Sequence, residues 1–289
     1  MPHPTASESH PLATWHRLEA DGLSLRYLAV EGVTKDTWIV FHGFGQKPSE
    51  FMEGALELAR IGRVLVVELP AHGQSNAPGN GIPVSLHVWE HWLTALCRKE
   101  RVHTCSIFGY SLGGRLALAS VLVLKGRVEQ LVLCAAEGAS PAFWYTVATQ
   151  TVLGRSLLVQ MVYQPGWVLG TLNLLARLGL LNKSVARFAG SQLGTKAQRR
   201  LVARSWMALR ALPGPRSEVI DVLNRSAIPL RVFAGKHDRV VPLSRMEALT
   251  DEVEDSRSEV LPVGHQHLPL AAIRRIVEEE LAAPDEASA

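Results

Sequence analysis

Ser106-Ile-Phe-Gly-Tyr-Ser-Leu-Gly-Gly114 is the stretch that decides the fold. A short apolar run, typical of a buried strand, ends at this motif, and residues 115–125 continue with a helical pattern. A Gly-x-Ser-x-Gly motif between a strand and a helix is typical of a sharp, strained elbow. Gly109 and Gly113 lack a β-carbon, so strand and helix can approach closely and lift the Ser111 hydroxyl clear of the sheet. The motif therefore predicts a serine nucleophile, with the Leu112 amide aimed at a developing oxyanion.

Other short apolar runs alternate with helical patterns along the chain. We expect further strands at 23–30, 37–41, 63–67, 131–135, 230–234 and 258–261. The first of these alternates in polarity, as a half-exposed edge strand does. Helices are expected at 49–60, 84–98 and 269–283, and frayed segments at 1–12 and 284–289. This alternation predicts a parallel sheet covered on both faces, with the chemistry beyond the carboxyl ends of its strands.

A serine hydroxyl needs a base within hydrogen-bond reach, and the base needs an acid that fixes its tautomer. Asp238 follows the apolar run 230–234, and His265 follows the run 258–261. Serine, aspartate and histidine thus occur in the chain order of one known class of catalytic triads.

Each of these assignments has an alternative. His267 is a second candidate for the base, and Glu137, which also follows a strand, is a second candidate for the acid. His42 and His72 are expected to be structural hydrogen-bonding residues near the mouth of the site.

Taken together, the motifs resemble the α/β-hydrolase superfamily. They are His42-Gly-Phe-Gly45, Glu68-Leu-Pro-Ala-His-Gly-Gln-Ser75, Gly109-Tyr-Ser-Leu-Gly-Gly114, Gly235-Lys-His-Asp-Arg-Val-Val-Pro242 and Val263-Gly-His265. The resemblance implies an α/β-hydrolase fold in which Ser111 is the nucleophile, His265 the base and Asp238 its orienting acid. It also implies an oxyanion hole made by the amides of Phe44 and Leu112, with Gly43, Tyr110 and Arg115 near the substrate.

Two positions depart from the family pattern, because Glu68 and Ala71 stand where the family often has aspartate and glycine. The departure weakens inference about that loop but leaves the triad untouched. An epoxide hydrolase or dehalogenase would carry aspartate at the position of Ser111, so the sequence argues against both.

Residues 137–224 have helical patterns and are expected to form a cap inserted into a core made of 1–136 and 225–289. Residues 138–217 contain ten lysines and arginines but no aspartate or glutamate. A basic, apolar cap could rest on an anionic membrane surface or present cations to an anionic or acyl-chain substrate. An ordinary cap with arginines facing water is the simplest alternative, and no nucleic-acid-binding motif accompanies the charge.

The composition, 47% hydrophobic and 20% charged, is that of a globular protein. We expect a cytoplasmic location, either in solution or at the membrane periphery, because the chain shows neither a signal-peptide pattern nor a long uncharged apolar run. Cys97, Cys105 and Cys134 are expected to be buried, reduced thiols. Without a metal-ligand cluster or a phosphate-binding glycine loop in the sequence, we expect no cofactor.

These observations predict a serine hydrolase that cleaves a carboxylic ester of a medium or long acyl group, lipid-like esters included, through an acyl-enzyme. The alternative is a carbon–carbon bond hydrolase or lyase that acts on an anionic substrate with the same triad. Residues 109–118, with Arg115 after the double glycine, are similar to the menaquinone-pathway synthase family. A third possibility is a ligand-binding hydrolase fold without activity, which the apparently complete triad disfavours.

Overall fold

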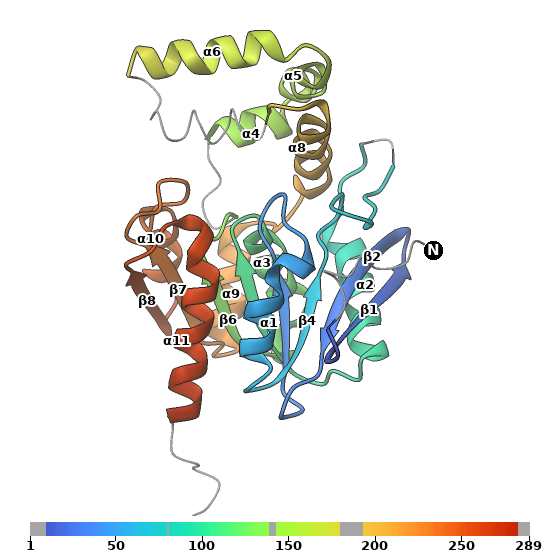
Figure 1. Cartoon of the computed structure of the whole chain (residues 1–289), viewed down its shortest axis with the longest axis vertical. Helices are drawn as coiled ribbons and strands as arrows, with labels where there is room; N and C mark the ends of the chain where they lie inside the picture. Colours follow the sequence, from blue (N-terminus) through green and yellow to red (C-terminus); the bar gives the residue numbers. More distant parts are fainter. Residues whose placement is uncertain (1–9, 80, 139–142, 180–192, 283–289) are drawn as a thin grey trace, which may run out of the picture.

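The computed structural model describes residues 10–79, 81–138, 143–179 and 193–282 (Figure 1). Among them, one mixed sheet has the strand order β1-β2-β4-β3-β5-β6-β7-β8. The strands are β1 (Ala13–Ala20), β2 (Leu23–Val30), β3 (Thr37–Phe41), β4 (Arg63–Val67), β5 (Cys105–Tyr110), β6 (Val128–Cys134), β7 (Leu230–Gly235) and β8 (Ser256–Leu261). Strands β3 to β8 are mutually parallel, and β1 and β2 are antiparallel additions at one side. The predicted fold class, a mostly parallel sheet flanked by helices, is confirmed.

One expectation about the sheet is wrong. Strand β2 was expected to be a half-exposed edge strand, but β1 pairs along its whole length and takes the edge position. All eight residues of β2 are buried or partly buried. The sequence does not reveal β1, because Ala13–Ala20 contains no continuous apolar run and its residues are partly buried or exposed.

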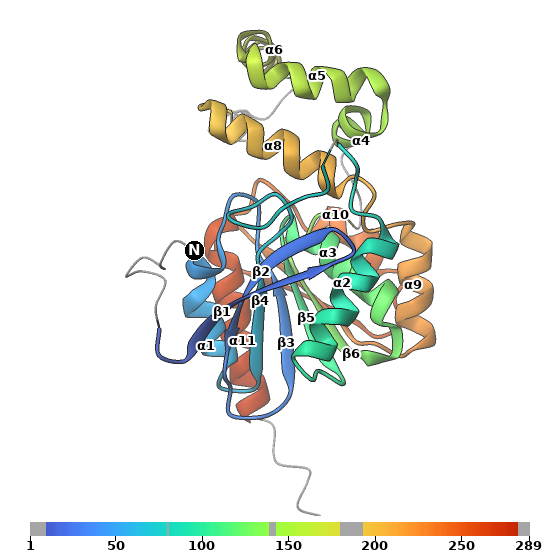
Figure 2. The ribbon, with the colours of Figure 1, turned by 90° about the vertical axis from the view of Figure 1, so that its right-hand side faces the viewer.

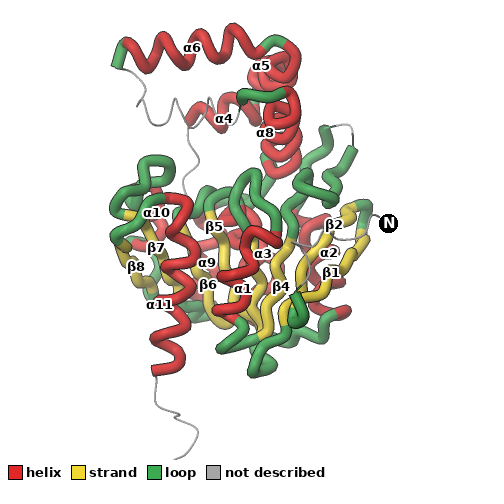
Figure 3. Tube along the Cα trace, viewed as in Figure 1, coloured by secondary structure: helices red, strands yellow, loops and turns green. Residues whose placement is uncertain are grey.

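Helices cover both faces of the sheet (Figure 2). One face carries α1 (Met52–Leu58), which extends the short helix η2 (Pro48–Phe51), together with α11 (Leu268–Ala282). The other carries α2 (Leu86–Lys99), α3 (Gly113–Leu124), α9 (Arg216–Arg225) and α10 (Ser244–Thr250). Figure 3 shows the sheet between the two helical layers. The helices expected at 49–60, 84–98 and 269–283 therefore form, with ends shifted by a few residues.

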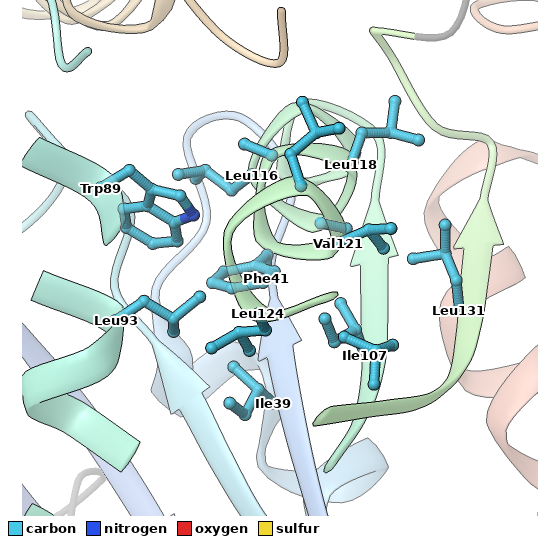
Figure 4. Packing of buried hydrophobic residues seen from close by; sticks show 14 of the residues in the cluster. Ile39, Phe41, Trp89, Leu93, Ile107, Leu116, Leu118, Val121, Leu124 and Leu131 are labelled. Atoms are coloured by element: carbon cyan, nitrogen blue, oxygen red, sulfur yellow. The ribbon is translucent and has the colours of Figure 1, made fainter. Parts of the chain in front are cut away.

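The main core lies between the sheet and α2 and α3 (Figure 4). Ile39, Phe41 and Ile107 project from the strands onto Leu116 and Val121 of α3, and all five are fully buried. Helix α3 is buried along almost its entire length because it is apolar on nearly all sides. This packing fixes the beginning of α3, and with it the elbow, relative to the ends of β3 and β5.

Helices α4 (Phe143–Gln150), α5 (Val152–Tyr163), α6 (Pro165–Arg177) and α8 (Lys196–Leu209) lie beyond the carboxyl ends of the strands (Figures 1 and 2). Helix α9, which we placed in the insertion of residues 137–224, packs on α3 instead. Its buried residues Val219, Ile220 and Leu223 belong to the core beneath the sheet. An amphipathic pattern does not reveal which surface a helix will cover, and we now propose that the insertion ends between α8 and α9.

Candidate active site

Ser111 lies at the turn between β5 and α3, with a backbone φ of +49°. This left-handed conformation is costly for a residue with a side chain and is held here by the surroundings. The Ser111 amide donates to the carbonyl of Cys134, and its carbonyl accepts from the amides of Gly114 and Glu137. A β-carbon at Gly109 would lie 2.5 Å from that of Ala117, which shows why glycine is required beside the serine.

The structure brings Ser111, His265 and Asp238 together from the ends of β5, β8 and β7. The Nε2 atom of His265 lies 3.3 Å from the Ser111 Oγ, and its Nδ1 lies 2.6 Å from Oδ2 of Asp238. The side chain of Asp238 is fully buried, and that of His265 is 12% exposed. With the Nδ1 proton donated to aspartate, Nε2 is left as an acceptor that faces the serine hydroxyl.

The second oxygen of Asp238 is also held. Its Oδ1 accepts from the amides of Val240 at 2.7 Å and Val241 at 3.1 Å. Burial by itself raises the pKa of this carboxyl, but the hydrogen bond and charge of His265 and the two amides outweigh burial, so the pKa is lowered. Asp238 is therefore ionised at neutral pH and can orient the imidazole.

The side chains of the two alternative residues do not join the hydrogen bonds between Ser111, His265 and Asp238. His267 is exposed within the short helix η4 (His265–His267). The Glu137 carboxylate lies 3.7 Å from the Nε of Arg115. The geometry therefore favours His265 and Asp238 over both alternatives.

The loop after β3 faces the elbow and is held by side chains. Gln46 Oε1 accepts from the Gly43 amide at 2.8 Å, and His72 Nε2 accepts from the Gly45 amide at 3.1 Å. Among the hydrogen bonds of the described residues, none uses the amide of Phe44 or that of Leu112. Fixing the amides on either side of Phe44 leaves its own N–H available, as a donor to a developing oxyanion must be.

His42 and His72 serve this loop as buried acceptors. His42 Nε2 accepts from the Leu69 amide, and the Nδ1 of each ring faces a backbone carbonyl. Burial lowers the pKa of His42 to about 3, with a further contribution from His72, and burial lowers the pKa of His72 to about 4. Both rings are neutral near pH 7, which agrees with the structural role predicted for them.

One of the two departures from the family pattern, Glu68, has a local explanation. Glu68 is buried, and its Oε2 accepts from the amides of Gln74 and Ser75 and from the Ser75 hydroxyl. The longer carboxylate therefore still closes the loop. Ala71 has a φ of +68°, a left-handed conformation that glycine adopts without strain.

Tyr110, which we predicted to lie near the substrate, is buried and faces the histidine loop. Its hydroxyl donates to the backbone carbonyl of His265 at 3.1 Å, and the two rings are 5.2 Å apart. A β-carbon at Gly43 would lie 2.7 Å from the Tyr110 ring. Gly43 and Tyr110 thus connect the loop after β3 to the loop after β8, a tertiary contact that the sequence alone does not reveal.

Arg115 is also buried, and its partners come from the insertion. Its Nη1 donates to the Leu212 carbonyl at 3.0 Å, and the guanidinium lies 3.9 Å from the ring centre of Tyr145 on α4. The Glu137 carboxylate lies 3.7 Å from the Nε of Arg115, and this buried Nε has no hydrogen-bond partner among the described residues. We expected Arg115 near the substrate, and the structure shows it joining the elbow helix to the insertion.

Cys97, Cys105 and Cys134 are buried and unpaired, as predicted. Burial raises the pKa of each thiol. In the described part of the chain, one cluster has the donor atoms of a metal site, the exposed group Asp21, His87 and His91, and none of these belongs to the triad. No helix of the described residues has the length and apolarity to cross a bilayer.

The strained elbow and the three converging side chains define the class, which sequence comparison also identifies. Residues 38–279 match the model of the alpha/beta hydrolase family, and the chain therefore belongs to this family.

Two curated relatives are similar in sequence. A 2-hydroxy-6-oxononadienedioate/2-hydroxy-6-oxononatrienedioate hydrolase of Paraburkholderia phymatum is 28% identical over 225 residues, which are 73% of this chain and 74% of that protein. A protein of Bacillus subtilis (strain 168), assigned as a 2-succinyl-6-hydroxy-2,4-cyclohexadiene-1-carboxylate synthase, is 33% identical over 118 residues. That second match spans 39% of this chain and 41% of the relative, less than half the length of either.

A hydrolase from Pseudomonas aeruginosa PA01 has a similar structure. It superimposes with a TM-score of 0.66 and 24% identity, covering 93% of this chain and 98% of the other. The likeness extends over nearly the entire chain and supports the fold.

Proposed function

We propose that the protein is a serine hydrolase that cleaves carboxylic esters. The observation that carries the proposal is the continuous path from Ser111 Oγ through the imidazole of His265 to Asp238, which begins at a strained elbow. His265 Nε2 takes the proton of the Ser111 hydroxyl as the oxygen attacks the acyl carbonyl. The amides of Phe44 and Leu112 stabilise the oxyanion that forms.

The second half of the reaction reuses the same groups. Protonated His265 donates its proton to the departing alcohol, which leaves the acyl group on Ser111. His265 then deprotonates a water that attacks the acyl carbon, and the returning proton restores the serine as the carboxylic acid departs. Asp238 stays ionised throughout and stabilises the imidazolium, consistent with its lowered pKa.

A medium or long acyl group fits the apolar surroundings of the proposed oxyanion hole. The side chain of Phe44 packs against the core of the insertion, a cluster made of Leu158, Met161, Val162, Leu193, Val202 and Ala203. Trp206 and Met207 of α8 lie on the same cluster. Because the Phe44 amide would face the reacting carbonyl, the apolar inner side of the insertion lies next to the place where an acyl chain would extend.

The test is turnover of p-nitrophenyl esters of increasing chain length by the wild type and Ser111→Ala. We expect kcat/KM to fall by about 10⁴-fold or more in the variant, and fluorophosphonate labelling to disappear. Ser106→Ala, at a buried serine of β5, the strand that leads into the elbow, is the matched control. It should keep both the ester turnover and the fluorophosphonate labelling. Unchanged turnover in a folded Ser111→Ala protein would remove the proposal.

A second candidate is hydrolysis or elimination at a carbon–carbon bond of an anionic substrate with the same triad. The sequence relatives favour it, because the compounds in their names, the product of the synthase and the substrates of the hydrolase, carry carboxylates. The engagement of Arg115 by Leu212, Tyr145 and Glu137 argues against its use as a carboxylate-binding cation.

Product analysis separates the two functions where active-site labelling does not. An ester yields one carboxylic acid and one alcohol. A succinylated cyclohexene carboxylate precursor would instead lose pyruvate by elimination. A diketone hydrolysed at its carbon–carbon bond would yield a carboxylic acid and a ketone, without an alcohol. Turnover of either of the last two substrates, well above that of any ester, would favour the second candidate.

A further inference from the structure

Helix α5 is apolar on both sides, which is unusual for a helix at the surface of a globular protein. Its buried residues are Gly154, Leu158, Met161 and Val162, which pack within the insertion. On the opposite side, Val152, Leu153, Val159 and Tyr163 are 74%, 70%, 49% and 66% exposed. The cation of this helix, Arg155, turns back to donate to the carbonyls of Thr149 and Gln150.

The neighbouring helix α6 also exposes apolar side chains. Trp167, Leu174 and the following Leu178 are exposed, and their spacing of seven and four residues places them along one side of the helix. Figures 1 and 2 show α5 and α6 at the end of the molecule farthest from the sheet. We call Val152, Leu153, Val159, Tyr163, Trp167, Leu174 and Leu178 the outer cap face.

The charged residues of α5, α6 and α8 are all cations. They are Arg155, Arg177, Lys196, Arg199, Arg200 and Arg204. Lys196, Arg200 and Arg204 are exposed along one side of α8. The ammonium of Lys196 lies 5.5 Å from the ring centre of Tyr163, which places the first of these three cations at the border of the outer cap face.

We propose that the outer cap face docks on the surface of an anionic lipid bilayer. A bilayer offers hydrocarbon to the apolar side chains and lipid phosphates to the cations, and aromatic residues such as Tyr163 and Trp167 favour the boundary between these zones. A second copy of this face would place cations against cations without an acid to pair them. A soluble polyanion would leave the apolar side chains in water.

The test is vesicle flotation of the full chain with phosphatidylcholine alone and with added phosphatidylglycerol. We expect binding to the anionic vesicles at low ionic strength and a decrease with added salt, because salt screens exposed charges. Val152→Glu/Val159→Glu should reduce binding by about tenfold or more. Lys196→Gln/Arg200→Gln/Arg204→Gln should reduce it by about a hundredfold, at about fivefold for each cation.

Matched controls come from exposed residues outside the insertion. Val33 and Val260 are 75% and 51% exposed, and Val33→Glu/Val260→Glu should bind vesicles like the wild type. Lys35→Gln/Arg98→Gln/Arg101→Gln removes three exposed cations of the core in the same way. Circular dichroism and thermal unfolding of each variant establish that it is folded.

Three outcomes would overturn the proposal. They are absence of flotation with anionic vesicles at low salt, equal flotation with neutral and anionic vesicles, and concentration-dependent dimerisation that Val152→Glu/Val159→Glu abolishes without vesicle binding. The last would assign the outer cap face to a second copy of the chain. The proposal does not depend on the proposed function, because Ser111→Ala should float like the wild type.

Discussion

At the carboxyl edge of the sheet, polar side chains are buried and held by backbone groups, whereas on the far side of the inserted helices apolar side chains face water. Asp238 and His72 are 8% and 1% exposed and have backbone partners, while Val152 and Tyr163 are 74% and 66% exposed. The difference follows from what each region must achieve. Catalysis requires side chains in fixed positions, so the polar groups at the carboxyl edge of the sheet are held by hydrogen bonds. A surface that docks on a bilayer requires only that its exposed side chains be apolar or cationic.

The first prediction concerns the two buried histidines of the edge. In the folded chain, the pKa of His42 is about 3 and that of His72 is about 4, both below the ordinary value of 6.5. Between these folded values and about pH 6.5, the unfolded chain therefore binds more protons than the folded chain. The contribution of the two neutral histidines to the free energy of unfolding is thus fully present above about pH 6.5. It is lost as the pH falls towards 4 for His72 and towards 3 for His42. Near pH 5 the loss is roughly 2 kcal/mol for each histidine.

Urea unfolding near pH 7.5 and near pH 5 measures this loss. His72→Gln removes one of the two titrations and should shrink the difference by roughly 2 kcal/mol. His103→Gln, at an exposed histidine, should leave the difference unchanged. A wild type that is equally stable at both pH values would contradict the assignment.

The elbow should be intolerant of a single methyl group. A β-carbon at Gly113 would overlap the carbonyl of Phe41 and lie 2.6 Å from the carbonyl oxygen of His42, so backbone would have to move. Gly113→Ala should cost about 2 kcal/mol or more in the free energy of unfolding. Gly126→Ala, where the added carbon has no neighbour within 4 Å, is the control and should be tolerated. Equal stability of both variants would show that the elbow adapts.

Tyr110 is expected to position the histidine loop rather than to bind substrate. Tyr110→Phe removes the hydrogen bond to the His265 carbonyl and should lower kcat for p-nitrophenyl esters by about fivefold, with KM almost unchanged. Tyr163→Phe, at an exposed tyrosine of α5, should leave both constants intact. A change confined to KM would instead indicate contact between Tyr110 and the substrate.

The smallest effect is expected on the outer cap face. Val152→Ala should change the free energy of unfolding by less than about 0.5 kcal/mol, because the side chain is already in water. Val132→Ala, the same substitution at a fully buried valine of β6, should cost about 1–2 kcal/mol. Comparable losses at the two sites would mean that the outer cap face is covered in the folded protein in solution.

The sequence predicted most strands of the sheet and the approach of three polar residues at its carboxyl edge. It did not predict the features that depend on tertiary packing. Apolar runs with sharp ends mark buried parallel strands, and the elbow motif and strand ends placed Ser111, Asp238 and His265. Strand β1 was missed because an edge strand needs no apolar run. The surroundings of Tyr110 and Arg115 depend on segments 155 and 97 residues away in the chain, and no local pattern encodes such contacts.

The chain order of the site also has a consequence for synthesis. Ser111 precedes His265 by 154 residues, and the whole insertion lies between them. A nascent chain that has emerged from the ribosome up to the end of α8 can form the elbow. It contains Ser111 but not yet His265, the proton acceptor of the serine. Under the proposed function, the growing polypeptide cannot catalyse the reaction until β7 has paired with β6 and β8 has paired with β7.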